Sequence, residues 1–331
     1  MTGPRPPARP LPLPTRDGVG PSCVALPAGP WPTIAACLAQ RFPAISPAVW
    51  AARMAAGEVV DEHGVPVTPE RHHQPRLRLY YYRALEAEAR IPFDEQLLFQ
   101  DEHLVVADKP HFLPVTPSGR YLQETLLVRL KRRLGLPDLV PLHRLDRETA
   151  GVVLFSAQPA TRGLYQRLFA ERRMHKLYEC IAPWRSELAW PLRYCSRLVD
   201  DEHFMRVREA PGEANAETEL DPIEVQGGWA RYRLAPTTGR RHQLRVHCAA
   251  LGLPILHDRI YPALLPADSD DLARPLQLLA KRIAFTDPLS GAARHFESPR
   301  HLLLAEVLQA GPPSLTLAPP PGPTGEPSHA R

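Results

Sequence analysis

Apolar residues recur at helical spacing in three stretches of the chain. In residues 121–135 leucines recur every four positions, and Gly135 stands where a C-terminal cap belongs. Residues 160–172 and 240–252 have a similar pattern, and the second of them ends at Gly252. This spacing predicts three helices, of which the first is amphipathic.

Apolar runs and alternating positions predict strands between these helices. Residues 151–156 lack alternation, which is typical of a strand buried on both faces. Residues 176–183 alternate, so Lys176 and Tyr178 are expected on one face. Further strand patterns occupy residues 104–110, 231–235, 277–285 and 293–298. Because helices and strands are mixed without a regular βαβ rhythm, we expect an α+β fold.

The first part of the chain has a pattern of its own. Two short helices are expected near residues 34–42 and 47–56. A hairpin over residues 57–67 and a strand over residues 77–85 follow them. These elements predict a small N-terminal α/β module.

The domain boundaries follow from these patterns and from changes in composition. Residues 1–30 and 311–331 are rich in proline, glycine and alanine without periodicity, which predicts disordered tails. The small module then occupies residues 31–88, and a larger main domain occupies residues 89–310.

Composition narrows the possible classes of protein. The chain has 331 residues, of which 44% are hydrophobic, as in ordinary globular proteins. It has no apolar run of about 18 residues, so we expect no membrane span. The five cysteines are widely spaced and form no C-x-x-C pair, which predicts reduced thiols in the cytoplasm.

Charge indicates an anionic partner only through its distribution. The formal net charge is just +4. Basic residues gather in three groups, which lie at residues 129–133, 167–176 and 240–245. Each group alone could be a solvated helix face, but three together favour a surface for RNA or phosphate.

Several common catalytic motifs are absent. The sequence has no G-x-G-x-x-G, P-loop or H-E-x-x-H, so we expect neither a nucleotide cofactor nor a metal. The segment HRLD differs from the kinase H-R-D loop, because Leu145 separates Arg144 from Asp146. The same segment nevertheless places an aspartate between two arginines beside a buried strand. Asp146 is therefore either a turn residue or a nucleophile held next to cations.

Three segments occur in a recognisable order: HRLDRETAGVVLFS, FAERRMHKLYE and TTGRRHQLRVHCAALGLPILHD. Together they resemble the RluA type of RNA pseudouridine synthases over roughly residues 91–300. The resemblance implies a central mixed, mostly antiparallel sheet flanked by helices. It also implies an isomerase that converts uridine to pseudouridine in RNA. The N-terminal module resembles the alpha-L RNA-binding motif of a ribosomal protein, although a generic helical lid with a hairpin would look similar.

The resemblance assigns roles to particular residues. Asp146 matches the catalytic carboxylate, and Arg245 matches its basic partner. Tyr178 matches the aromatic residue that stacks on the target uracil, and Arg144 matches the arginine that replaces the flipped base. Lys176 takes a supporting role. We also expect RNA contacts from Arg147, Arg240 and His242.

The chemistry of the reaction is consistent with these roles. Uracil leaves the ribose, rotates and rejoins through carbon, so neither a cofactor nor a metal is required. The carboxylate must be ionised, and a nearby guanidinium with a bidentate fork would lower its pKa. The reaction does not obviously need an imidazole, so the histidines are expected to be structural hydrogen-bonding groups: His143, His242 and His247.

Other interpretations stay open at this point. Tyr178 could simply be a packing residue, and Arg245 could cap a helix or pair with Glu179. The chain could also be a non-catalytic RNA-binding or ribosome-assembly protein on the same fold. The intact set of Asp146, Tyr178 and Arg245 favours the enzyme.

The chain also departs from the family pattern at five positions: Asp108, Phe112, Thr116, His257 and Leu279. These changes indicate a divergent branch, so the substrate does not follow by analogy. We expect RNA as the partner, with ribosomal RNA favoured and transfer RNA possible. No protein partner is required, and we expect a monomer.

Overall fold

The computed structural model describes residues 13–83, 88–265, 271–309 and 311. The chain divides into two compact units. The first comprises residues 1–89, 117–124 and 128–137, and the second comprises residues 90–116, 125–127 and 138–331. The second unit therefore begins where the main domain was expected, but the first also takes in two later segments.

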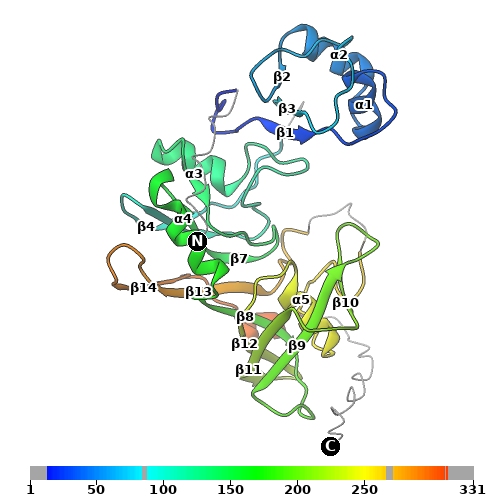
Figure 1. Cartoon of the computed structure of the whole chain (residues 1–331). Helices are drawn as coiled ribbons and strands as arrows, with labels where there is room; N and C mark the ends of the chain where they lie inside the picture. The colour runs from blue at the N-terminus through cyan, green and yellow to red at the C-terminus, as the bar shows by residue number, and fades with distance from the viewer. Residues whose placement is uncertain (1–12, 84–87, 266–270, 310, 312–331) are drawn as a thin grey trace, which may run out of the picture. The chain divides into compact units, whose positions relative to one another are not determined.

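The first unit combines two helices with a small antiparallel sheet (Figure 1). The helices are α1 (Ile34–Arg41) and α2 (Pro47–Ala55), and the side chains of Thr33 and Ser46 cap their N-termini. Such caps satisfy backbone N–H groups that have no partner within the helix. The strands are β1 (Ser22–Ala25), β2 (Val59–Asp61) and β3 (Arg78–Tyr81), in the order β1-β3-β2. Trp50 is fully buried in the core of this unit.

The prediction of a disordered tail over residues 1–30 is wrong for its last part. Strand β1 pairs with β3 along its whole length, from Ser22 opposite Tyr81 to Ala25 opposite Arg78. Val24 and Leu26 are buried because they face the core of the unit, while Cys23 and Ala25 are exposed. The surrounding prolines obscured this short alternation. Residues 1–12 and 312–331, the rest of the predicted tails, lie outside the described residues.

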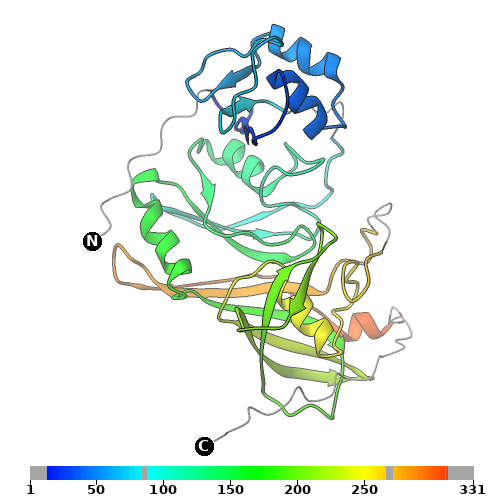
Figure 2. The same ribbon diagram turned by 45° about the vertical axis from the view of Figure 1, so that its right-hand side comes forward.

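The second unit is built on one large sheet of eleven strands (Figure 2). The strands run in the order β10-β9-β11-β12-β8-β13-β7-β5-β4, with β14 beside β13 and β6 beside β7. The pairing of β13 with β7 is parallel and every other pairing is antiparallel. The expected mixed, mostly antiparallel sheet of an α+β fold is confirmed.

The strands of this sheet have the following bounds: β4 (Gln96–Gln100), β5 (Leu104–Lys109), β6 (Val140–Pro141), β7 (Ala150–Ser156), β8 (His175–Pro183), β9 (Leu192–Asp200), β10 (Val207–Ala210), β11 (Ala216–Gln226), β12 (Trp229–Pro236), β13 (Leu278–Thr286) and β14 (Ala293–Glu297). The strands from β9 to β11 had not been predicted, because many of their side chains are exposed and charged.

The remaining helices are α3 (Leu126–Leu134), α4 (Pro159–Ala170), α5 (Gln243–Ala250) and α6 (Leu304–Gln309). Helix α3 begins five residues later than predicted, since backbone N–H groups of residues 122–124 donate to the Glu88 carboxylate instead. In Figure 1, α5 lies beside β9 and β10. None of the helices in the described ranges is long and apolar enough to cross a membrane.

The loop that contains Asp146 leads into the N-terminal end of the buried strand β7. All seven of its residues are buried, as the missing alternation predicted. Gly151 has a φ of 116°, and a Cβ there would lie 2.2 Å from the Ala280 carbonyl oxygen. Only glycine allows β7 and β13 to approach this closely in parallel. This close contact fixes the start of β7, and with it the loop that contains Asp146.

Candidate active site

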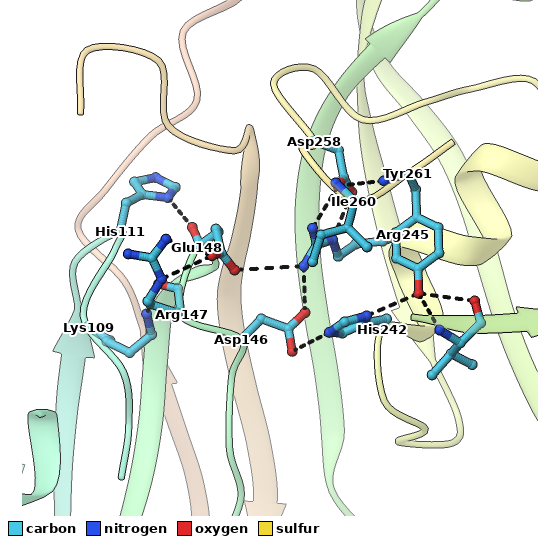
Figure 3. A network of polar contacts seen from close by, with 11 residues as sticks. Lys109, His111, Asp146, Arg147, Glu148, His242, Arg245, Asp258, Ile260 and Tyr261 are labelled. Carbon is cyan, nitrogen blue, oxygen red and sulfur yellow. Dashed lines mark hydrogen bonds and ion pairs between the residues drawn. The ribbon is translucent and has the colours of Figure 1, made fainter. Parts of the chain in front are cut away.

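Asp146 lies in the short loop that connects β6 to β7. The loop closes with a hydrogen bond from Thr149 N to the Asp146 carbonyl oxygen, at 3.1 Å, while Leu145 is buried beneath it. Asp146 is therefore a turn residue through its backbone, but its carboxylate is turned toward α5 (Figure 3). The structure thus shows a turn residue whose carboxylate lies next to cations, and its role as a nucleophile remains a prediction.

Arg245 of α5 makes the predicted contact with Asp146. Its Nη1 donates to Asp146 Oδ2 at 3.2 Å and lies 3.8 Å from Glu148 Oε2. Its side chain is only 1% exposed, so a charge is held inside the protein. The alternative pairing with Glu179 is wrong, because Glu179 accepts from Arg231 at 3.0 Å.

The bidentate contact of Arg245 was expected with Asp146, but the structure gives it to Asp258. Nε and Nη2 of Arg245 donate to the two oxygens of Asp258 at 2.7 and 2.6 Å. Asp258 also accepts from the backbone N–H groups of Ile260 and Tyr261. Burial lowers the pKa of Arg245, but the carboxylates of Asp258, Asp146 and Glu148 raise it, and the net shift is upward.

Asp258 was missed by the sequence analysis. It ends the segment GLPILHD, in which His257 departs from the family pattern. An aspartate at the end of that recognised segment was the available signal. It holds the fork of Arg245 in place through Nε and Nη2, which leaves Nη1 for Asp146.

The surroundings of Asp146 keep its carboxylate ionised. Burial raises its pKa, but the nearby His242, Arg245 and Lys109 lower it, and the net shift is downward. The side chain is still 27% exposed, so it is reachable from outside. An accessible carboxylate that is ionised at neutral pH can act as a nucleophile or as a base.

His242 lies directly before α5 and next to the same carboxylate. Its Nε2 is 3.7 Å from Asp146 Oδ1, and its Nδ1 is 3.0 Å from the Tyr261 hydroxyl oxygen. The backbone of His242 is left-handed, with φ 54°. Only 10% of its side chain is exposed. The structure therefore places His242 next to Asp146. A contact of His242 with RNA remains a prediction.

Tyr178 and Lys176 belong to β8, two residues apart. Tyr178 is half-buried and packs against the core of the unit. Burial and then the Asp146 charge raise the pKa of Tyr178, so its hydroxyl stays protonated. Lys176 donates to the Thr238 carbonyl oxygen at 2.6 Å, and burial lowers its pKa to about 8. Lys176 thus joins β8 to the segment before α5, which fits a supporting role.

The three arginines expected to contact RNA differ in their exposure and in their hydrogen bonds. Arg144 is exposed and has no hydrogen bond or ion pair with any residue that the structure describes. Arg240 is exposed and donates to the Asn215 carbonyl oxygen at 3.3 Å. Arg147 is half-buried and donates to Glu148 at 3.1 Å. Their roles toward RNA remain predictions.

Lys109 at the end of β5 is a further buried cation near the site. Its Nζ donates to the carbonyl oxygens of Pro110, Leu113 and Arg147 at 2.8–3.0 Å. Burial lowers its pKa to about 7. Lys109 belongs to the strand pattern over residues 104–110, which predicted no role for this lysine. The bond to Arg147 O ties the loop of Asp146 to β5.

The other two histidines that were expected to be structural, His143 and His247, serve as hydrogen-bonding groups. His143 Nε2 accepts from Leu154 N at 3.1 Å, and burial lowers its pKa to about 3. His247 lies between the hydroxyls of Ser196 and Thr218. Across the described ranges, no group of three or more His, Cys, Asp or Glu residues could hold a metal ion.

Comparisons with known proteins agree with the resemblance seen in the motifs. The family model described as RNA pseudouridylate synthase matches residues 103–250. The dual-specificity RNA pseudouridine synthase RluA of Salmonella typhimurium is 34% identical over 207 residues, which is 61% of this chain and 92% of RluA. The human pseudouridylate synthase RPUSD2 is 36% identical over 170 residues, which is 50% of this chain and 30% of the human protein.

Solved structures show the same fold. The human RNA Pseudouridylate Synthase Domain Containing 1 has a TM-score of 0.52 at 21% identity, covering 68% of this chain and 97% of that one. The match to RPUSD2 spans less than a third of the human protein's length, whereas the match to RluA spans nearly all of it. The chain belongs to the RluA-type RNA pseudouridine synthase family.

Proposed function

We propose that this protein isomerises uridine to pseudouridine in RNA, with Asp146 as the catalytic carboxylate. The observation that carries the proposal is the contact of Asp146 Oδ2 with Arg245 Nη1 at 3.2 Å. Arg245 is buried and stays protonated, so its positive charge lowers the pKa of Asp146. The carboxylate therefore stays ionised even when a nucleobase of the RNA covers it.

The neighbouring side chains support a reaction on a flipped nucleotide. A uridine within a helix is out of reach, and flipping it out costs a few kcal/mol. The exposed Arg144 can fill the vacated stack, and it lies two residues from Asp146. The aromatic ring of Tyr178 can stack on the uracil, which offsets about 1–3 kcal/mol of that cost.

The RNA itself is proposed more coarsely. The helix-and-sheet arrangement of the first unit is compatible with an alpha-L-like RNA-binding module. Since that motif was first known from a ribosomal protein, we favour ribosomal RNA over transfer RNA. We further propose that the protein works in the cytoplasm as a monomer, without a protein partner.

A pseudouridine map of total cellular RNA at single-nucleotide resolution tests the proposal. It compares cells with the intact protein and cells with Asp146→Ala. We expect one or a few pseudouridines to vanish in the variant, which would also identify the RNA and the uridine. Identical maps, with purified protein that still binds RNA, would instead support a non-catalytic RNA-binding or ribosome-assembly protein.

A further inference from the structure

The hydrogen bonds of Tyr261 determine which nitrogen of His242 carries a proton. Val207 N donates to the Tyr261 hydroxyl at 2.7 Å, and that hydroxyl donates to Val207 O at 3.1 Å. A hydroxyl has one proton and two lone pairs. Val207 is buried, and a buried carbonyl without a donor costs about 1–3 kcal/mol. The hydroxyl proton therefore belongs to Val207 O.

This arrangement leaves one lone pair on the hydroxyl for His242. The Nδ1 of His242, 3.0 Å away, must then donate its proton to Tyr261 (Figure 3). A neutral imidazole with a proton on Nδ1 has a free lone pair on Nε2. That lone pair points toward Asp146, and the separation of 3.7 Å is too long for a hydrogen bond. Two acceptors that face each other are expected to stay this far apart.

The backbone of His242 indicates that the imidazole is held in place. A residue other than glycine in the left-handed region costs about 1–3 kcal/mol and persists only where the surroundings enforce it. His242 has φ 54°, immediately before the first turn of α5. The ring also packs edge-on against Tyr261, with centroids 5.7 Å apart. These contacts direct Nε2 to the side of Asp146.

The proposed reaction requires a proton acceptor. When uracil rejoins the ribose through C5, that carbon holds both the new bond to C1′ and its original hydrogen. A base must take this hydrogen as a proton. The C5–H electron pair then forms the C5–C6 double bond, the C6–N1 π pair moves to N1, and N1 takes up one proton. The atoms balance and no oxidation occurs.

We propose that His242 Nε2 is the base that takes the C5 proton. The inference rests on the proposed function, since it assigns one step of that reaction. The imidazolium formed would lie 3.7 Å from the Asp146 carboxylate, which stabilises it, and its proton can pass to N1 or to water. Asp146 then serves the ribose, and a separate group serves the uracil ring.

The electrostatics around His242 are consistent with a neutral imidazole. Burial lowers its pKa, and the positive charges of Arg245 and Arg241 act in the same direction. The carboxylates of Asp146 and Asp258 act in the opposite direction, and the net shift is downward. At neutral pH the ring is therefore ready to accept a proton.

His242→Asn is the variant that tests the proposal. Asparagine adopts the left-handed region readily, and its amide N–H can replace the Nδ1–H bond to Tyr261, but it has no basic nitrogen. The substrate is an in vitro transcript that spans the uridine identified by the map, made with uridine or with 5-deuterouridine. We expect turnover to fall by about 10²–10⁴-fold. A primary deuterium isotope effect should then appear, because loss of the C5 hydrogen has become the slow step.

A transcript with 5-fluorouridine separates this role from a structural one. Fluorine replaces the C5 hydrogen, so this nucleotide can be rejoined through carbon without losing a proton, and the C6–N1 double bond that is left takes up water, with hydroxide on C6 and the proton on N1. His242→Asn should therefore react with it at the wild-type rate, while its turnover of uridine is impaired. His301→Asn, which changes an exposed histidine, is the matched control and should leave both reactions unchanged.

Two results would overturn the assignment. The first is unchanged turnover of uridine by His242→Asn. The second is an equal loss on uridine and 5-fluorouridine transcripts without an isotope effect, which would mean that His242 only shapes the site. If the wild-type protein makes no pseudouridine in any RNA, the proposed function fails instead, and that outcome is visible before any variant is compared.

Discussion

Asp146 and Asp258 share one guanidinium and differ in almost everything else. Asp258, in the segment after α5, is 1% exposed and accepts from two nitrogens of Arg245 and two backbone N–H groups. Asp146, in the loop before β7, is 27% exposed and accepts one bond from Arg245. The saturated carboxylate anchors the cation. The other keeps free lone pairs, so it is the one available for chemistry.

The shared arginine makes this division possible. With Asp258 alone, the pair would be neutral and buried. Because Nη1 remains free of Asp258, it is directed to Asp146 and also lies near Glu148. One fixed cation thus has a structural side, toward Asp258, and a side toward Asp146 that is functional under the proposed reaction. The following substitutions separate the two sides, beginning with the largest expected effect.

Asp146→Asn should abolish the reaction and spare the fold. We expect turnover to fall by about 10⁴-fold or more, because an amide is neither a nucleophile nor a base. The free energy of unfolding should change by less than about 1 kcal/mol, since Asp258 still neutralises Arg245. Single-turnover assays and urea unfolding measure the two effects. A large loss of RNA affinity with activity retained would contradict the assignment.

Asp258→Asn, unlike Asp146→Asn, should strongly destabilise the fold. Removing one partner of a buried ion pair costs about 3–5 kcal/mol, because it leaves the charge of Arg245 without its main partner. Urea unfolding, compared with Asp146→Asn as the matched variant, measures the difference. If both variants lost the same stability, the structural side and the functional side would not be distinct.

Tyr178→Leu should weaken RNA binding by about 1–3 kcal/mol, because the stacking surface for one base is lost. The matched control is Tyr194→Leu, since Tyr194 is also half-buried and packs against the same core. That control should lose stability but not affinity. Binding measured by fluorescence anisotropy on the identified transcript gives the comparison. Equal losses of affinity in both variants would reduce Tyr178 to a packing residue.

His143 lies in the loop of Asp146, and His143→Gln should change how the free energy of unfolding depends on pH. The native pKa of His143 is lowered to about 3 by burial, below its ordinary value of 6.5. As pH falls below 6.5, the unfolded chain takes up a proton that native His143 does not, so the free energy of unfolding falls. The decline is at most about 1.4 kcal/mol per pH unit and ends near the native pKa.

Glutamine keeps an acceptor for Leu154 N but cannot be protonated in this range. Urea unfolding at pH 7 and pH 5 should therefore show a smaller decline for His143→Gln than for the wild type. The matched control is His301→Gln, which changes an exposed histidine outside the loop of Asp146. An unchanged decline in His143→Gln would mean that its native pKa is not depressed.

Much of the second unit was predictable because its signals are local. The fully apolar run of β7, the alternation of β8 and the periodicity of α5 each lie within one short segment. Strands β9–β11 escaped prediction because their charged side chains are compatible with solvent on one face. Strand β1 escaped because proline-rich composition hid four residues that gain a partner only in β3.

The contact of Asp146 with Arg245 was predictable only through the recognised motifs, since 99 residues separate the two. The third of these motifs contained Asp258, but nothing local distinguished a carboxylate that anchors an arginine from one at a turn. Partner choice in an ion-pair network depends on distances between distant segments. The bidentate contact was accordingly expected with the wrong aspartate.

By itself, the sequence determined the mixed α+β elements, the absence of familiar cofactor motifs and the group of residues from which the site is built. Those properties follow from local periodicity and from residue types at fixed spacing. Only the tertiary structure decided that Asp258 anchors Arg245, that Lys109 supports the loop of Asp146, and that Tyr261 sets the tautomer of His242. Hydrogen bonds have direction and short range, so the chemistry of each group depended on which neighbours folding brought within reach.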